Sequence, residues 1–379
     1  MSGSSPTEFS QEFLEGLTHE TPYFLFSKKR IVDNFKEFKK HFPEALIQYA
    51  MKANSEPEVL RTLLKAGSGF EVASVYELQM LQEIGVPPDR IIYGTSVKPI
   101  SHIKEFFKYG VDRYAFDSLP ELEKIAAVAP GSKVYVRVVV NDSGSVFRFS
   151  EKFGTNKENM TPLLQRAKEL GLQPYGVSFH VGSQASNPKS WANALENLQP
   201  ILWHLQKLGI AIEVINIGGG YPCNYASAEN NLTLEEIASY TLAQHKKLPF
   251  QPKLILEPGR GIAATAAVLI TSVIGRVERQ GNTWLFLDAG VYNALFETMA
   301  YQGSTRYRVT SLRSSYDAGE MMFELAGPTG DSPDVISREA LLPKDIQVGD
   351  KLVFHDVGAY SLVTSSRFNG FPKPDVYLI

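Results

Sequence analysis

One lysine stands where a lysine can do covalent chemistry. Lys52 follows the apolar run Ala45–Met51, which has the composition of a strand, and precedes a segment with helix-like spacing. An amine at the carboxyl end of a strand points into a site, where desolvation or neighbouring charge lowers its pKa. Such an amine can form an imine with a carbonyl group. The simpler interpretation is a solvated lysine beside a strand.

Two other motifs are suited to holding an anion. Gly218–Gly220 follow an apolar run, and three successive glycines let backbone amides converge without obstruction by side chains. Glu257, Gly259 and Arg260 follow another such run and add an anion-pairing guanidinium. A flexible turn is the alternative for the glycines. A phosphate cradle and a reactive Lys52 together suggest pyridoxal phosphate (PLP), whose aldehyde needs an amine and whose phosphate needs an anchor.

Short apolar runs alternate with helix-like segments between residues 45 and 260, which is typical of repeated βα units. Eight such units predict a closed (β/α)8 barrel of the TIM type, with catalytic groups at the carboxyl ends of the strands. Asp117 and Ser118 are interpreted as helix caps and left outside the site. The expected strands are Ala45–Met51, Gly69–Ala73, Ile91–Tyr93, Tyr114–Phe116, Lys133–Val140, Tyr175–Phe179, Glu213–Ile217 and Lys253–Leu256.

The pattern changes after about residue 262. Alternating apolar and polar segments such as Val268–Val277 and Lys351–His355 predict a C-terminal antiparallel β domain. The strand-like Tyr23–Phe26 is expected to join it. The predicted organisation is therefore an N-terminal segment at 1–27, a PLP-binding barrel at 28–262 and a β domain at 263–379.

Composition narrows the class of partner. The net charge of −3, with scattered lysine and arginine, argues against nucleic acid and favours a small-molecule substrate. A single cysteine and the absence of histidine ligand spacing argue against a disulfide framework and a metal site. No apolar stretch is long enough to span a membrane and no signal core is evident, so the expected location is the cytoplasm.

Seven motifs together carry a family resemblance. They resemble, in the same order and over nearly the whole chain, motifs of ornithine decarboxylases of the alanine-racemase fold (fold type III). The strings are Tyr-Ala-Met-Lys-Ala-Asn, Phe-His-Val-Gly-Ser-Gln, Gly-Gly-Gly-Tyr-Pro, Glu-Pro-Gly-Arg, Gly-Pro-Thr-Gly-Asp-Ser-Pro-Asp, Gly-Ala-Tyr and Phe-Asn-Gly-Phe.

The resemblance implies a set of roles. Lys52 would form the imine with PLP, Glu257 would meet the pyridine nitrogen, and His180 would stack on the ring. Racemases of this fold usually have an arginine in place of Glu257, so the carboxylate favours decarboxylation. Glu71 and Arg137 would lie near the cofactor. The groups expected around the phosphate are Ser183, Gly218, Gly219, Gly220, Gly259, Arg260 and Tyr360.

Two departures from the family pattern concern the substrate. Gly330 stands where the family has a cysteine credited with controlling protonation, while Asp331 beside it is suited to accept a hydrogen bond from a distal ammonium. No substrate-reading aspartate is evident in the segment 296–302, which ends at Gln302. The resemblance also implies a homodimer whose sites are shared, with the Gly330 loop and Phe368 supplied by the partner.

The predicted activity is PLP-dependent decarboxylation of an L-amino acid, with ornithine or a related diamino acid as default, giving an amine of the polyamine type. Three alternatives stay open. The first is a decarboxylase of a modified amino acid or siderophore-type conjugate. The second is an amino-acid racemase, and the third is a non-catalytic protein that binds a partner, as antizyme inhibitors do.

Overall fold

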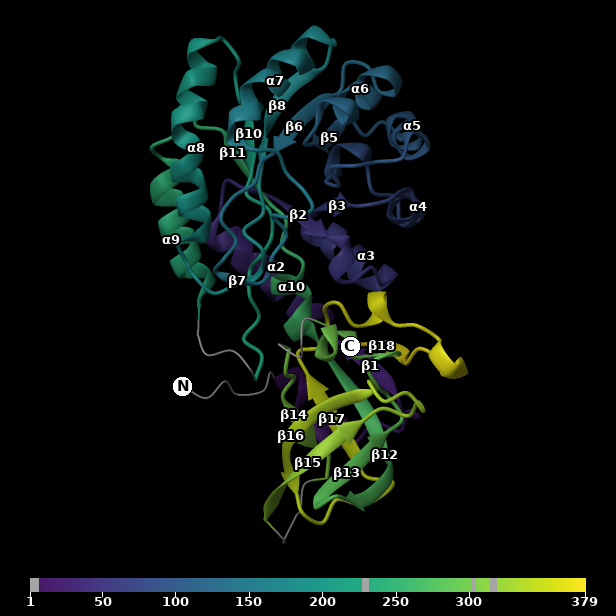
Figure 1. The fold of residues 1–379 in the computed structure, drawn as a ribbon. Coiled ribbons are helices and arrows are strands. Elements are labelled where there is room, and N and C mark those ends of the chain that lie inside the picture. Colours follow the sequence, from purple (N-terminus) through teal and green to yellow (C-terminus); the bar gives the residue numbers. More distant parts are fainter. Residues whose placement is uncertain (1–6, 227–231, 301–304, 314–318) are drawn as a thin grey trace. The chain divides into compact units, whose positions relative to one another are not determined.

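The chain divides into two compact units in the computed structural model, which describes residues 7–226, 232–300, 305–313 and 319–379 (Figure 1). The described residues within 1–31, 223–229 and 263–379 form one unit, called the β domain below. Those within 32–222 and 230–262 form the other, the barrel unit. The expected boundaries at 27/28 and 262/263 stay a prediction. Gln302 lies outside the described residues.

Eight parallel strands close the barrel, so the (β/α)8 prediction is confirmed. Their order around the barrel is β10-β11-β2-β3-β4-β5-β6-β8, and every expected run contains or overlaps one of them. The strands are β2 (Leu46–Ala50), β3 (Gly69–Val72), β4 (Ile91–Tyr93), β5 (Arg113–Phe116), β6 (Lys133–Arg137), β8 (Gln173–Ser178), β10 (Val214–Asn216) and β11 (Lys253–Leu256).

A helix follows each barrel strand, as the alternation predicted (Figure 1). The helices begin and end at ordinary signals: Pro57 lies in the first turn of α3, and Gly67 after its end has a φ of 95°. Helix α2 (Lys28–His41), before the first barrel strand, was not among the segments expected from the sequence. The helices after the strands are α3 (Pro57–Ala66), α4 (Val75–Glu83), α5 (Ile100–Tyr109), α6 (Leu119–Val128), α7 (Met160–Glu169), α8 (Ser190–Lys207), α9 (Leu234–His245) and α10 (Arg260–Ala263).

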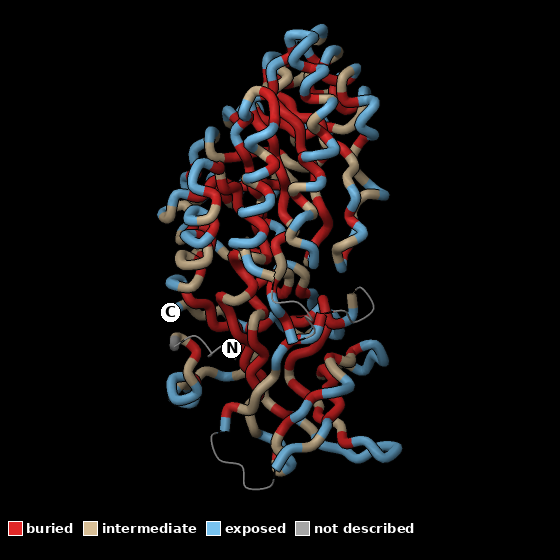
Figure 2. The backbone as a smooth tube through the Cα atoms, turned by 90° about the vertical axis from the view of Figure 1, so that its left-hand side faces the viewer, coloured by how far each residue is buried: buried red, intermediate tan, exposed pale blue. Residues whose placement is uncertain are grey.

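The barrel strands are buried on both faces, which explains their continuous apolar runs (Figure 2). Ile92, Val214 and Ile255 from three strands pack together as one apolar cluster. Ser118 occupies the N-cap position of α6 as expected, but its side chain makes no capping hydrogen bond. The Asp117 carboxylate instead accepts a hydrogen bond from the Gly154 backbone N–H at 2.9 Å.

The β domain contains an eight-stranded sheet. Its order is β14-β17-β12-β13-β15-β16, and β1 and β18 join it beside β12. The strands are β1 (Tyr23–Phe26), β12 (Ala267–Arg279), β13 (Asn282–Leu287), β14 (Val309–Ser311), β15 (Glu320–Ala326), β16 (Val335–Pro343), β17 (Lys351–His355) and β18 (Asp375–Leu378). The predicted N-terminal strand is confirmed, because β1 pairs with β12.

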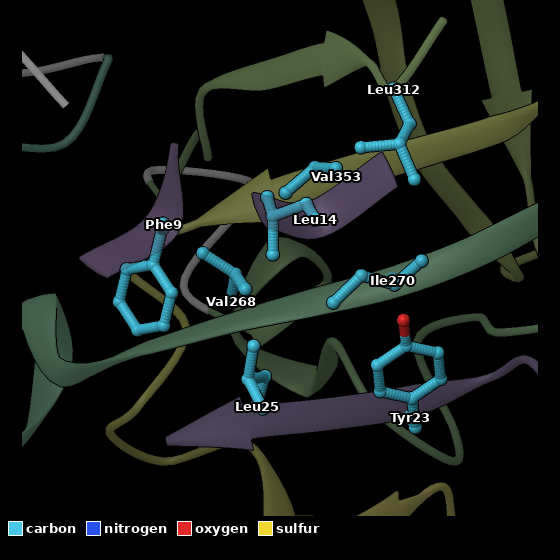
Figure 3. Close-up of a cluster of buried hydrophobic side chains, with 8 residues drawn as sticks. All are labelled: Phe9, Leu14, Tyr23, Leu25, Val268, Ile270, Leu312 and Val353. Atoms are coloured by element: carbon cyan, nitrogen blue, oxygen red, sulfur yellow. The ribbon is translucent and has the colours of Figure 1, made fainter. Parts of the chain in front are cut away.

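The sheet is mostly antiparallel but not wholly so. β13 pairs with β15 and β1 pairs with β18 in the parallel direction, because long connections rather than hairpins join these strands. The N-terminal segment is anchored by a cluster of buried side chains that comes from both ends of the domain's sequence (Figure 3). The cluster contains Phe9, Leu14, Tyr23, Leu25, Val268, Ile270, Leu312 and Val353.

Candidate active site

Lys52 follows β2 in a short 3-10 turn, Met51–Ala53. Its side chain is 48% exposed, and its Nζ lies 3.9 Å from Oε2 of Glu71 on β3. Glu71 is buried, and Gly94 leaves space for it, since a Cβ on Gly94 would lie 2.4 Å from Oε1 of Glu71. The amine is therefore accessible to a ligand while a fixed carboxylate stands beside it.

Glu257 follows β11 directly and is tied to the neighbouring strand β10. Asn216 Nδ2 donates a hydrogen bond to Glu257 Oε1 at 2.5 Å, and the Gly218 N–H donates to Asn216 Oδ1 at 3.0 Å. Burial, and next the charge of Glu71, raises the pKa of Glu257 to about 7. A positive charge brought against this carboxylate would favour its ionised form. Glu257 is thus a fixed acceptor for a cationic ligand group.

Asn216 was missed by the sequence analysis. It links the acidic side chain to the glycine run, because one amide group bonds both. The available signal was an amide at the end of the apolar strand β10, one residue before the segment that turns at Gly218. A buried asparagine in such a strand needs polar partners, and here both are part of the candidate site.

The glycine run makes a bend that only glycine can adopt. Gly218 and Gly220 have φ angles of 68° and 98°. A Cβ on Gly219 would lie 2.7 Å from the Glu257 carbonyl oxygen and 3.2 Å from Nε2 of His180. Trp191 Nε1 donates a hydrogen bond to the Gly219 carbonyl oxygen at 3.2 Å. The bend is therefore held in place and packs closely against two predicted site residues.

His180 is held in one orientation and one protonation state. The Gly182 N–H donates to His180 Nδ1 at 3.0 Å. Burial, and next the charges of Lys52 and Arg137, lowers the pKa of His180 well below its usual value. The ring is consequently neutral, and because Nδ1 accepts a hydrogen bond, the proton resides on Nε2.

The segment after β11 comes close to the turn that carries Lys52. A Cβ on Gly259 would lie 2.8 Å from the Cβ of Ala53, so glycine is needed for this approach. Arg260, which is 4% exposed, begins α10 immediately afterwards. Ser183 begins β9 (Ser183–Ala185), which pairs with β7 (Ser145–Phe147). The barrel residues predicted to bind the cofactor phosphate thus include the buried guanidinium of Arg260.

Three phenylalanines after β6 contact three predicted site side chains. Phe147 lies under Arg260 at 5.6 Å, and Phe153 lies under Arg137 at 5.3 Å. Phe149 meets the His180 ring edge-on, with ring centroids 5.0 Å apart. The sequence analysis did not single them out, although aromatic residues recurring in a polar segment were a visible signal. The segment after β6 thus contributes ring contacts to three of the predicted site side chains.

Glu77 adds a third carboxylate near Lys52. Its Oε2 accepts a hydrogen bond from the Ala73 N–H at 2.6 Å. Burial raises the pKa of Glu77 to about 7, and the charges of Glu71 and Lys52 act on it in opposite directions. Glu71, Glu77 and Glu257 therefore place three acidic side chains near Lys52, and Arg137 is a second cation acting on Glu257.

The expected substrate residues lie in the β domain. The Tyr292 hydroxyl donates a hydrogen bond to Asp331, and the Tyr292 ring packs against Phe368 with centroids 4.4 Å apart. Both Asp331 and Phe368 are exposed, and Gly330 faces open space. Tyr360 also belongs to this unit and has a left-handed φ of 55°. The substrate and phosphate roles expected for these residues stay predictions.

The barrel residues fit PLP. Lys52 offers an accessible amine for the aldehyde, Arg260 and the glycine bend suit a phosphate, and Glu257 suits a protonated pyridine nitrogen. Among the described residues, no group of three or more His, Cys, Asp or Glu side chains could hold a metal ion.

A family comparison decides the cofactor class. Residues 28–264 match the model of the pyridoxal-dependent decarboxylase, pyridoxal binding domain. The chain belongs to this family. It is therefore a PLP-dependent decarboxylase, a lyase, and the resemblance found in the motifs is confirmed. Within the described part of the chain, no helix has the length and apolar character to cross a membrane.

Curated relatives of this decarboxylase cover most of its length. It is 33% identical to the lysine/ornithine decarboxylase of Selenomonas ruminantium, over 93% of this chain and 88% of that protein. It is 34% identical to the ornithine decarboxylase of Mus pahari, over 90% and 76%. It is also 31% identical to antizyme inhibitor 2 of Xenopus laevis, over 94% and 80%.

Solved structures agree with the family over the whole fold. SrLDC in complex with PLP and cadaverine has a TM-score of 0.90 at 31% identity, covering 100% of this chain and 95% of that one. The lysine/ornithine decarboxylase of Vibrio vulnificus complexed with putrescine has a TM-score of 0.90 at 30% identity, covering 99% of each chain. The arginine decarboxylase of Paramecium bursaria Chlorella virus bound to agmatine has a TM-score of 0.89 at 30% identity, covering 97% and 98%.

Proposed function

We propose that this decarboxylase removes the α-carboxylate of an L-diamino acid, with L-ornithine as the default substrate and L-lysine as its nearest competitor. The observation that carries the reaction type is the fixed Glu257 carboxylate, held by Asn216 beside the glycine bend. The diamino-acid class is supported by the names of the relatives, which act on ornithine, lysine or arginine. Exposed Asp331 supplies a carboxylate suited to a distal ammonium.

The barrel residues divide the work. When bound, PLP supplies an electron-accepting ring that stabilises the carbanion left by carbon dioxide. Glu257 would keep the ring nitrogen protonated through a charge-assisted hydrogen bond. Lys52 would provide the exchanging amine, and Glu71, 3.9 Å from its Nζ, would orient it. Neutral His180 would pack against the ring without adding a charge that would compete with Glu257.

A substrate panel tests this assignment. Purified holoenzyme is assayed for carbon dioxide release from L-ornithine, L-lysine, L-arginine and a citrate-conjugated diamino acid. We expect kcat/KM for ornithine or lysine to exceed the value for the conjugate at least tenfold. A higher kcat/KM for the conjugate would refute the proposal that the substrate is a free diamino acid, and it would support a modified amino acid as the substrate. Asp331→Asn should raise KM for diamino acids more than it lowers kcat, because it removes a charge partner of the distal amine.

We also propose that the enzyme is a homodimer with shared sites. The exposed Gly330, Asp331 and Phe368 support this, because the family resemblance assigns them to the partner's site. Inactive Lys52→Ala is mixed with Asp331→Ala after gentle dissociation and assayed at a substrate concentration far below the raised KM of Asp331→Ala. About a quarter of the wild-type activity should appear, since half the dimers are mixed and each has one intact site. No restoration in a preparation shown by light scattering to contain mixed dimers would refute shared sites.

Racemase activity and a purely binding role are the competing functions. A buried carboxylate at Glu257 argues against a racemase, and a set of barrel residues that fits PLP argues against a purely binding role like that of antizyme inhibitor 2. Chiral analysis of the recovered substrate tests for a racemase, which would produce the D-enantiomer. Release of carbon dioxide would refute a purely binding role. A cytoplasmic location stays a prediction.

A further inference from the structure

The segment that follows β6 is closed by one carboxylate. Asp142 lies in this segment and is 6% exposed. Its Oδ2 accepts hydrogen bonds from the backbone N–H groups of Phe149 at 2.7 Å and Ser150 at 3.0 Å, and its Oδ1 accepts from the Ser150 hydroxyl at 2.9 Å. Burial raises the pKa of Asp142, but these hydrogen bonds outweigh it and leave that pKa below its usual value. This ionised carboxylate and its three bonds are called the Asp142 clasp below.

The Asp142 clasp fixes a part of the segment that strand pairing does not reach. Strand β7 ends at Phe147, which is the last residue to pair with β9 and lies opposite Ser183. Phe149 comes two residues later, and the clasp bonds its backbone directly. Strand pairing therefore holds Phe147, whereas Asp142 holds Phe149.

Phe149 in turn contacts His180, which is expected to pack on the cofactor ring. The two side-chain rings meet at 76°, with centroids 5.0 Å apart. The Gly182 N–H donates to His180 Nδ1 at 3.0 Å, and Gly182 packs so closely on Ser145 that a Cβ would collide with the serine hydroxyl. The segment closed by the clasp therefore packs against both His180 and the glycine that bonds it.

We propose that Asp142 is a positioning residue of this decarboxylase, which holds Phe149 against His180 and so keeps the imidazole oriented toward the cofactor ring. The consequence for the cofactor rests on the role proposed for His180, whereas the hold on Phe149 rests on the hydrogen bonds alone. Arg260 provides an internal comparison, because Phe147 lies under its guanidinium and is held by strand pairing. Loss of the clasp should disturb His180 and leave Arg260 in place.

Three variants isolate the clasp. In Asp142→Ala, two backbone N–H groups lose their acceptor and turn to water, which draws Phe149 away from His180. Asp142→Asn is the conservative variant, since its amide oxygen can accept from both N–H groups. Asp117→Ala is the matched control, because it removes a carboxylate that accepts from the Gly154 N–H at 2.9 Å in the same segment.

The first readout is the exchange of the carbon-bound Cε1 hydrogen of His180 for deuterium. Mass spectrometry of the full-length chain measures it with and without PLP. The exchange proceeds through the charged imidazole, and burial, followed by the charges of Lys52 and Arg137, lowers the pKa of His180. A ring released from its packing becomes charged more easily, so we expect roughly tenfold faster exchange in Asp142→Ala. Asp142→Asn and Asp117→Ala should stay within about twofold of wild type.

The second readout is retention of the cofactor by holoenzyme. PLP should dissociate about tenfold faster from Asp142→Ala than from wild type, because one face of its ring loses an ordered neighbour. The affinity of the cofactor-free chain for inorganic phosphate should change by less than about twofold, since Arg260 keeps its place. Faster exchange at His180 with unchanged loss of PLP would refute the effect on the cofactor without touching the assigned reaction.

Two further outcomes would overturn the proposal. Wild-type exchange in a folded Asp142→Ala would show that the clasp does not hold Phe149 against His180. Equal acceleration in Asp117→Ala would show a general loosening of the segment. Should Asp142→Ala fold poorly by circular dichroism, Asp142→Glu replaces it, because it keeps the charge but shifts the carboxylate by one methylene. Faster exchange in that variant supports the proposal, and wild-type exchange refutes it.

Discussion

Lys52 and Lys98 each follow a strand of the same barrel, but their side chains differ in exposure and in hydrogen bonding. Lys52 comes after β2, is half-exposed, and lies 3.9 Å from Glu71. Lys98 comes after β4, has a fully buried side chain, and lies 2.9 Å from Glu121. Its Nζ also donates to the carbonyl oxygens of Thr95 at 2.9 Å and Ala115 at 2.5 Å. Lys98 is thus committed to structure.

The comparison shows what a reactive lysine requires. Burial lowers the pKa of Lys98 to about 8, against the partial compensation from Glu121. A search for perturbed pKa values alone would therefore select Lys98, which no ligand can reach. Lys52 combines access with an acidic neighbour on the adjacent strand β3, and the glycine bend follows β10, two strands away around the barrel. Accessibility, and not the size of the pKa shift, separates the two.

The sharpest way to break this comparison is Lys52→Ala. We expect loss of the visible absorbance of bound cofactor and a fall in kcat of about 10³-fold or more, because Lys52 is the only lysine in the turn Met51–Ala53 that follows β2. Tm without cofactor should change little, since the side chain is half-exposed. A kcat within tenfold of wild type would show that another lysine forms the imine with the cofactor.

Lys98→Met should act on stability instead of chemistry. Removing one partner of a buried ion pair costs about 3–5 kcal/mol, and we expect the lower end, about 3 kcal/mol, because Lys124 still pairs with Glu121 at 2.5 Å. Urea unfolding measures the change. The folded fraction should keep its cofactor absorbance and kcat; a selective loss of kcat at full stability would place Lys98 in the reaction.

Glu257→Gln tests the role of the Glu257 carboxylate in the site that contains Lys52. The amide keeps an oxygen for Asn216 but cannot stabilise a protonated ring nitrogen. We expect kcat to fall about 10²-fold with cofactor affinity reduced less. Glu83→Gln, an exposed change on α4, is the matched control. A near-normal kcat would contradict the role given to Glu257.

The smallest expected effect is on the pH dependence of stability. The pKa of Glu257 rises from 4.5 to about 7 on folding, so the folded chain holds this proton more tightly. Stability from this group is present below pH 4.5 and is lost as the pH rises through 7. Cofactor-free wild type should lose roughly 1–2 kcal/mol more than Glu257→Gln between pH 5.5 and 7.5. Parallel melting curves for the two proteins would contradict this.

Much of the architecture was predictable because its signals are local. The barrel strands were found from short apolar runs, and β1 from the aromatic Tyr23–Phe26. Helix α2 and the parallel pairs of the β domain were not found. A strand's period shows which residues are buried but not the direction of its partner, because pairing depends on how the intervening chain crosses the sheet.

The sequence by itself determined that a lysine, a glycine triplet and the Glu-Pro-Gly-Arg motif follow predicted strands. The end of a strand and the need for glycine both show in a few neighbouring residues of the sequence. Only the tertiary structure decided that Asn216 bonds Glu257, that Phe149 covers His180, and that Lys52 is reachable while Lys98 is not. Those facts depend on distances between residues far apart in the chain, which barrel closure fixes.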